Sequence, residues 1–362
     1  MGNWKNGELG DFVTLKRGFD LPQQKREDGQ VPIFSSSGIT GTHSTAMVKA
    51  PGVITGRYGT IGEVFYAAKD FWPLNTTLFV EDFHGNDAKF IYYFLKTLEW
   101  SKFTSASAVP GINRNTVHKE IVSLPDIETQ RRIASTLSMF DEKIKINTEI
   151  NDILLDQAQT LYKQHFPYSV QDDLPDGWRI GTVGEIIEIH DSKRIPLSGA
   201  DRMKMEKKIY PYYGAASLMD YVDNYIFDGK YLLLGEDGTV VDDAGYPILQ
   251  YVWGQFWVNN HAHILTGRLG FNVESLYMLF KQTPVKSIVT GAVQPKISQA
   301  NLRSVQVVIP PERNLKEYND LVEPLFSLLR ANEEECKSLA ALRDTLLPKL
   351  MSGEIDVSAV QL

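Results

Sequence analysis

The chain carries an internal repeat, and this repeat restricts its architecture more than any other feature of the sequence. The segment W-K-N-G-E-L-G-D-F at Trp4–Phe12 is matched by W-R-I-G-T-V-G-E-I at Trp178–Ile186, 174 residues later. The turn G-R-Y-G-T at Gly56–Thr60 is matched by G-E-D-G-T at Gly235–Thr239, and F-W-P-L-N by F-W-V-N-N, at offsets of 179 and 185 residues. Loop insertions explain the growing offset. Because only two copies are present, the sequence predicts a tandem duplication and not a solenoid.

Each copy of the repeat consists of a mixed segment followed by a long amphipathic stretch. Runs of β-branched and aromatic residues, such as Val53–Thr55 and Tyr231–Leu234, are bounded by turn-forming residues and predict short strands. From about 128 to 166 and from about 315 to 350, apolar residues recur every three or four positions, which predicts two long helices. We therefore predict an α+β fold of two homologous mixed domains separated by two long helices. The predicted divisions are a first domain at 1–125, a first helix at 126–167, a second domain at 168–310, a second helix at 311–351 and a C-terminal tail at 352–362.

The apolar positions of the two predicted helices match each other. In both helices they follow the alternating four- and three-residue spacing that is typical of a coiled-coil seam. Two unrelated surface helices would not need matched seams, so we predict an antiparallel coiled coil about a pseudo-two-fold axis. Asn147 and Asn332 occupy equivalent positions near the middle of each seam, and we predict that these buried polar residues select the register of the pair.

Composition excludes several classes of protein. Hydrophobic residues make up 43% of the chain and charged residues 23%, which excludes a disordered or fibrous protein. No apolar run approaches the ~20 residues that a membrane-spanning helix needs. The single cysteine, Cys336, excludes internal disulfides and cysteine-rich zinc sites, and we expect a cytoplasmic protein. The net charge of −8 disfavours purely electrostatic binding to DNA, although the segment 193–208 is locally basic.

Motifs that would indicate an enzyme are absent or weak. The sequence has no P-loop, no G-x-G-x-x-G nucleotide motif and no [DNS]-P-P-[YF] motif of amino-methyltransferases. His261 and His263 have the spacing of two side chains on one face of a strand, but no third metal ligand is visible near them. Asp176 with Glu206 and Lys208 is similar to the loose acidic motif of metal-dependent nucleases, a pattern that recurs by chance. We therefore predict no catalytic residue, metal or cofactor on this chain.

Several motifs together resemble one protein family. They are the L-P-x-G-W opening at Leu174–Glu185, the G-[RE]-x-G-T turns, the A-V-Q-P-K-I-S run at Ala292–Ser298 and the T-L-L-P-K-L-M-S-G-E-I-D segment at Thr345–Asp356. In this order, in two copies that each end in a long helix, they resemble the specificity subunits of type I restriction-modification systems. The resemblance covers essentially the whole chain.

This resemblance implies a DNA-binding adapter without catalytic activity. Each mixed domain would be a target-recognition domain for one half of a bipartite site in double-stranded DNA. The helical pair would set the spacer and dock two modification (methyltransferase) subunits. S-adenosylmethionine, ATP and Mg²⁺ would be bound by those subunits and by the restriction (translocase and nuclease) subunits. The alternatives are a metal-dependent nuclease and a coiled-coil protein scaffold that does not bind DNA.

The differences between the two copies indicate candidate DNA-binding residues. Arg57 and Tyr58 in the first copy are replaced by Glu236 and Asp237 in the second. An arginine can bind guanine O6 and N7, and a carboxylate can accept a hydrogen bond from cytosine N4, although a turn facing water is an equally compatible interpretation. The predicted phosphate contacts are Lys49, Lys102, Arg114, Lys193, Arg194, Lys204, Lys207, Lys208 and Lys296, and for each of them an ordinary solvated surface residue is the alternative. The predicted polar loop residues near base edges are Thr104, Ser105, Ser107 and Gln294.

Overall fold

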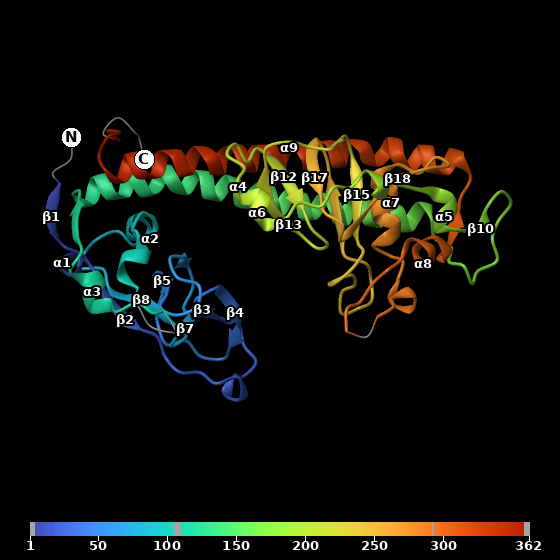
Figure 1. Cartoon of the computed structure of the whole chain (residues 1–362). Coiled ribbons are helices and arrows are strands. Elements are labelled where there is room, and N and C mark those ends of the chain that lie inside the picture. Colours follow the sequence, from blue (N-terminus) through green and yellow to red (C-terminus); the bar gives the residue numbers. More distant parts are fainter. Residues whose placement is uncertain (1–3, 105–109, 292, 358–362) are drawn as a thin grey trace. The chain divides into compact units, whose positions relative to one another are not determined.

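The computed structural model describes residues 4–104, 110–291 and 293–357, which form two compact units. Unit 1 contains Met1–Asn147 together with Glu333–Leu362, and unit 2 contains Thr148–Asn332. The two long helices, α4 (Ile127–His165) and α9 (Glu312–Met351), each contribute one part to unit 1 and the other part to unit 2 (Figure 1). Each unit therefore contains the mixed segment of one copy of the repeat and a portion of both long helices.

Unit 1 is built on a four-stranded antiparallel sheet with the strand order β2–β8–β5–β6. A second sheet has the order β4–β3–β7, and β1 pairs with β9. The strands are β1 (Lys5–Glu8), β2 (Thr14–Arg17), β3 (Val31–Ser35), β4 (Gly38–His43), β5 (Gly52–Gly56), β6 (Val64–Ala67), β7 (Trp72–Pro73), β8 (Thr77–Asp82) and β9 (Ile121–Leu124). The helices are α1 (Leu9–Phe12), α2 (Ala88–Lys96) and α3 (Arg114–His118), with 3₁₀ turns at Gln23–Lys25 and Trp100–Phe103.

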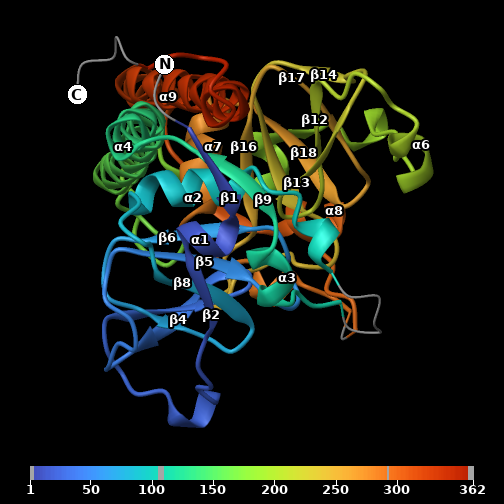
Figure 2. The same ribbon diagram turned by 90° about the vertical axis from the view of Figure 1, so that its left-hand side faces the viewer.

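The core of unit 1 lies between the four-stranded sheet and the long helices. Figure 2 shows α2 lying over the sheet, and the side chains of Phe90 and Ile91 on α2 are fully buried there with Val53 of β5. Leu137 of α4 and Leu350 of α9 belong to the same cluster of buried side chains. Portions of both helices are therefore part of this domain's core, although the predicted boundaries set the helices apart from the domains.

Unit 2 repeats this arrangement. Its four-stranded sheet has the order β11–β18–β15–β16, a second sheet has the order β13–β12–β17–β14, and β10 pairs with β19. The strands are β10 (Arg179–Thr182), β11 (Ile187–Ile189), β12 (Tyr210–Tyr213), β13 (Leu218–Val222), β14 (Phe227–Asp228), β15 (Tyr231–Gly235), β16 (Leu249–Val252), β17 (Gln255–Val258), β18 (Ala262–Gly267) and β19 (Gln306–Ile309). The helices are α5 (Val183–Ile186), α6 (Gly199–Met203), α7 (Val273–Phe280) and α8 (Gln299–Ser304), with 3₁₀ turns at Asp191–Lys193 and Lys286–Ile288. The predicted fold of two homologous mixed domains is confirmed.

The long helices contact each other in antiparallel orientation within each unit. In unit 1, Arg343 pairs with Asp141, and the Asn147 side-chain amide donates to Glu335 at 2.7 Å. Residue numbers therefore rise along α4 as they fall along α9, which confirms the predicted antiparallel pair.

The same orientation is found in unit 2. The Asn332 side-chain amide donates to Asn151 Oδ1 at 2.9 Å, and the Tyr318 hydroxyl donates to the Ala158 carbonyl at 3.0 Å. Asn147 is 1% exposed and Asn332 is 8% exposed, so both lie at the contact between the helices. Their role in selecting the register stays a prediction.

Among the described residues, no helix is both long enough and apolar enough to cross a membrane.

Candidate nucleic-acid interface

Three segments of unit 1 meet at the turn that follows β5. The Arg57 backbone N–H donates to the Thr76 carbonyl at 2.8 Å, and the Ile112 N–H donates to the Arg57 carbonyl at 3.0 Å. Tyr58 forms a β-bridge with Gly111, where a Cβ atom would lie 2.2 Å from the tyrosine ring, so any larger residue would displace that ring. The turn, the residue before β8 and the loop that leads into α3 therefore form one surface.

The same three segments meet in unit 2 through equivalent hydrogen bonds. The Glu236 N–H donates to the His261 carbonyl at 2.8 Å, and the Ile297 N–H donates to the Glu236 carbonyl at 2.8 Å. A β-bridge joins Asp237 to Lys296. The shared hydrogen bonds make these positions structurally equivalent. The equivalent pairs are Arg57 with Glu236, Tyr58 with Asp237, Thr76 with His261, Gly111 with Lys296, and Arg114 with Gln299. Arg114 and Gln299 are each the first residue of a short helix, α3 and α8 respectively.

The surface that these three segments form in unit 1 borders an open cationic cavity of about 760 Å³. Its walls include Lys16, Arg17, Arg57 and Arg114, with Asp20 as the carboxylate among the lining residues. Arg17 lies 3.8 Å from Asp20, and Lys16 forms an ion pair with Glu81. The guanidinium of Arg57 stacks on the Tyr58 ring, 4.5 Å from its centroid, and donates to the Tyr58 hydroxyl. This cavity can accept a phosphate or the acceptor edge of a base.

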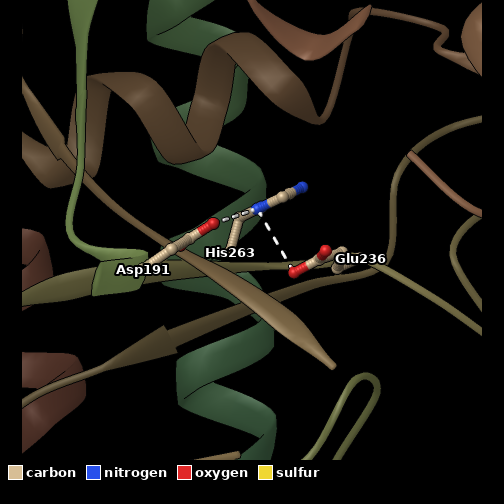
Figure 3. Close-up of side chains that lie close together, drawn as sticks. All are labelled: Asp191, Glu236 and His263. Carbon is tan, nitrogen blue, oxygen red and sulfur yellow. Dashed lines mark hydrogen bonds and ion pairs between the residues drawn. The ribbon is translucent and has the colours of Figure 1, made fainter. Parts of the chain in front are cut away.

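The equivalent place in unit 2 is filled by a buried network of charged side chains (Figure 3). His263 Nδ1 lies 2.6 Å from Asp191 Oδ2 and 3.7 Å from Glu236 Oε2. His263 Nε2 donates to the Ile297 carbonyl at 2.8 Å. Arg194 donates to Glu236 at 2.6 Å and lies 3.3 Å from Asp191, so its guanidinium joins the two carboxylates. In unit 2 the carboxylates are therefore neutralised by Arg194 within the domain, whereas the equivalent place in unit 1 is open and lined by basic side chains.

Asp191, Glu236 and His263 are also ligand types that a divalent cation prefers, and their ligand atoms lie within 4.8 Å of one another. The sequence shows no third ligand near His263, whereas the structure brings Asp191 and Glu236 to it. Asp191 precedes His263 by 72 residues, too far for any local spacing to show. Arg194 already supplies a positive charge to both carboxylates, so the cluster is satisfied without a metal. His261 does not belong to this cluster and instead contacts Asp237.

Both carboxylates of the network are held in the ionised form. Burial opposes ionisation of Asp191, but the hydrogen bond from His263 and the nearby positive charges outweigh it and lower the pKa of Asp191. Burial likewise opposes ionisation of Glu236, and the hydrogen bond from Arg194 with the neighbouring cations lowers the pKa of Glu236 below its usual value. These side chains therefore stabilise the folded domain as ion pairs.

Three residues predicted to contact DNA are engaged inside unit 2. The side chains of Arg194 and Glu236 are each 13% exposed and bind each other. The side chain of Asp237 is 17% exposed and accepts a hydrogen bond from His261 Nδ1. Each of these side chains would have to break an internal contact before it could reach a base or a phosphate, and its contact with DNA stays a prediction.

The other predicted residues divide by their exposure. Lys49, Lys102, Arg114, Lys193, Lys204, Lys207, Lys208, Gln294 and Lys296 are exposed. Three of them have ion-pair partners: Lys102 with Glu99 at 2.6 Å, Lys208 with Asp220 at 3.4 Å and Lys296 with Glu236 at 3.2 Å. The Thr104 hydroxyl donates to the Ser101 carbonyl, and Ser105 and Ser107 lie outside the described residues.

The structure adds residues that sequence reasoning missed. Arg17 joins Arg57 and Arg114 at the cavity of unit 1, and His261 lies beside the turn of unit 2. The repeat contained a signal for Arg17, because the 174-residue offset aligns it with Asp191, which holds the same place in unit 2. Neither Asp176 nor Glu206 of the nuclease-like motif belongs to the cluster of metal-ligating side chain types found among the described residues.

Comparisons with known proteins agree with this architecture. The model of the type I restriction modification DNA specificity domain matches residues 1–155 and 175–340. The type I restriction enzyme MjaIX specificity subunit of Methanocaldococcus jannaschii is 23% identical over 309 residues, which cover 75% of this chain and 70% of that protein. The MjaVIII specificity subunit of the same organism is 20% identical over 406 residues, covering 98% and 93% of the two chains. The fold is similar to that of the type I restriction-modification S subunit from M. genitalium, with a TM-score of 0.60, 20% identity and 96% coverage of each chain.

Proposed function

Because this chain belongs to the family of type I restriction-modification DNA specificity subunits, we propose that its two units recognise the two halves of one bipartite DNA site. The proposal rests on the turn, loop and short helix that meet in the same way in both units but carry different side chains. Equivalent surfaces with different chemistry suit two half-sites of unrelated sequence. The family match favours neither a nuclease nor a scaffold without DNA binding.

In unit 1 we propose that Arg57 binds guanine and that Arg17 and Arg114 bind backbone phosphates. The guanidinium of Arg57 is held by its stacking on Tyr58, which leaves it ordered for a bidentate contact with O6 and N7. Arg17 and Arg114 line the same cavity and can bind phosphate oxygens. The exposed lysines proposed as further phosphate contacts are Lys49, Lys102, Lys193, Lys204, Lys207, Lys208 and Lys296.

Sequencing of methylated sites in cells that carry this chain and its neighbouring methyltransferase tests the assignment of Arg57. We expect a bipartite motif for the natural chain. Arg57→Ala is expected to relax one base pair of one half-site, with a cost of about 1–3 kcal/mol, and to leave the other half-site unchanged. Lys69→Ala, an exposed cation of the same unit outside the cavity, serves as the control. Unchanged selectivity of Arg57→Ala would refute this contact.

The paired helices offer a docking surface for methyltransferase subunits in each unit. Met139 and Ile146 of α4 lie seven residues apart, as do Leu321 and Leu328 of α9, so each pair lies along one helix face. These side chains, with Leu342 in unit 1 and Ile153 in unit 2, are between 45% and 57% exposed. We propose that each unit binds one methyltransferase subunit through such a patch. A mass measurement that finds one methyltransferase per chain at saturation would contradict this stoichiometry.

We further propose that the helical pair sets the spacer between the half-sites. Insertion of four residues at matched points of α4 and α9 adds about 6 Å to each helix. We expect the spacer of the methylated motif to lengthen by one or two base pairs while both half-site sequences stay unchanged. A variant that methylates the original spacing would show that the helices do not set it.

The chain is proposed to act without catalysis of its own, in the cytoplasm. S-adenosylmethionine, ATP and Mg²⁺ would be bound by the modification and restriction subunits. Highly purified chain should transfer no labelled methyl group to DNA until a methyltransferase subunit is added. Methyl transfer by the chain alone would overturn this proposal.

A further inference from the structure

We propose that His261 is the base-recognising side chain of the turn in unit 2, and that Asp237 orients its ring. This inference rests on the proposed function, because it names the residue that would select a base in the second half-site. It also replaces the assignment of Glu236 and Asp237, the residues that the sequence alone indicates.

The carboxylates of the turn are unavailable for bases. Glu236 is bound by Arg194 at 2.6 Å and by Lys296 at 3.2 Å. Asp237 is largely buried and accepts a hydrogen bond from His261. A base that approached either carboxylate would have to displace a charged or hydrogen-bonded partner, which costs more than one new hydrogen bond supplies.

His261 lies at the right place for this role. The His261 carbonyl accepts a hydrogen bond from the Glu236 N–H, as the Thr76 carbonyl accepts one from the Arg57 N–H in unit 1. His261 and Thr76 therefore lie beside the equivalent turns of the two units. The backbone N–H of His261 donates to Asn259 Oδ1 at 2.8 Å, which holds the tight connection between β17 and β18. The His261 side chain is 43% exposed, more than the side chain of either turn carboxylate.

The contact with Asp237 determines which ring nitrogen is presented. The carboxylate oxygen of Asp237 accepts this hydrogen bond, so Nδ1 of His261 carries the proton and donates it. In the neutral ring, Nε2 then has a lone pair, and among the described residues it has no hydrogen-bond partner. A fixed acceptor suits an exocyclic amino group in the major groove. Such a group is present on cytosine as N4 and on adenine as N6.

Selection of bound sequences from randomised half-site DNA tests the inference in the complex of the full chain with its methyltransferase. We expect one position of the second half-site to prefer cytosine or adenine with the natural chain, and the selected base distinguishes the two amino groups. His261→Ala should reduce that preference about 3–10-fold, the effect of one hydrogen bond, and leave the first half-site unchanged. Thr76→Ala, the equivalent position in unit 1, and Gln255→Ala, an exposed residue at the other end of β17, should leave the second half-site unchanged.

Asp237→Asn separates orientation of the ring from a purely structural role. An amide can donate to Nδ1, which allows the other tautomer and makes Nε2 a donor. We expect the preference at the same position to move toward guanine or thymine, whose O6 or O4 accepts. If Asp237 only supported the fold of the turn, the variant would lose preference without exchanging it, and that result would overturn its orienting role.

The outcomes separate this inference from the proposed function. A bipartite site that keeps its full second half-site with His261→Ala would overturn the inference and leave the proposed function standing. Absence of any bipartite site with the natural chain would overturn both. A midpoint of unfolding equal to that of the natural chain shows that unit 2 of each variant is folded, and an unchanged first half-site shows the same for unit 1.

Discussion

Replacement of Arg194 by alanine tests whether this residue stabilises the second domain or contacts DNA. The sequence places Arg194 in a locally basic segment that predicts phosphate contacts. In the structure its guanidinium binds Glu236 and Asp191 and donates to the carbonyl oxygens of Asn260 at 3.2 Å and Ala262 at 2.9 Å. Loss of the side chain removes all of these contacts while both carboxylates stay in the domain.

The size of the effect follows from the partners that remain. Asp191 keeps His263, the Ile264 N–H and the Gln299 amide, and Glu236 keeps Lys296. Removal of one partner from a buried ion pair costs about 3–5 kcal/mol. Because the carboxylates keep other donors, we expect a loss of about 3 kcal/mol, at the lower end of that range. For a domain of 150–250 residues this corresponds to a midpoint of unfolding roughly 6–12 °C lower.

Two measurements on the full chain separate the interpretations. Scanning calorimetry of Arg194→Ala should show the lower midpoint, and Lys193→Ala, the exposed neighbour, should unfold as the natural chain does. The salt dependence of DNA binding should be the same for the natural chain and Arg194→Ala under conditions where both are folded. A residue that contacts a phosphate would instead lower the slope by about one without a change in stability. A lower salt slope with unchanged stability of Arg194→Ala would refute the buried role of Arg194.

Three further predictions concern pH, the helix pair and docking. The stability of unit 2 should fall as the pH drops below about 4.5, because folding lowers the pKa values of Asp191 and Glu236 and the unfolded chain therefore takes up protons first. Urea unfolding between pH 6 and pH 3 measures this fall, and a constant free energy of unfolding would contradict the prediction. Replacement of both Asn151 and Asn332 by leucine should raise the midpoint of unfolding but yield methylated sites with a mixture of spacer lengths. A single spacer length would show that the asparagines do not select the register. Leu328→Asp should remove one of two bound methyltransferase subunits in native mass spectra, and retention of both would place the docking surface elsewhere.

Sequence patterns predicted the architecture because the patterns that encode it are local or repeated. Helix α4 was expected at 126–167 and spans Ile127–His165, since an apolar period of three to four residues along one stretch is enough to define an amphipathic helix. The repeat predicted two domains of one fold, and the matched seams predicted their antiparallel helices. The turn of the proposed recognition surface was also visible as a repeated motif, G-R-Y-G-T in the first copy and G-E-D-G-T in the second.

Tertiary structure alone decided which side chains of those motifs are available. Arg57 and Glu236 occupy equivalent turns, yet the first lines an open cavity and the second is locked by Arg194 from 42 residues earlier in the chain. A charged residue in a sequence does not reveal whether a distant partner neutralises it. The contacts of Asp191 with His263, and of Asp237 with His261, depend on strands that meet only after folding. Local patterns therefore indicated where the two proposed recognition surfaces lie, whereas long-range pairing of charges decided which of their side chains are open to solvent.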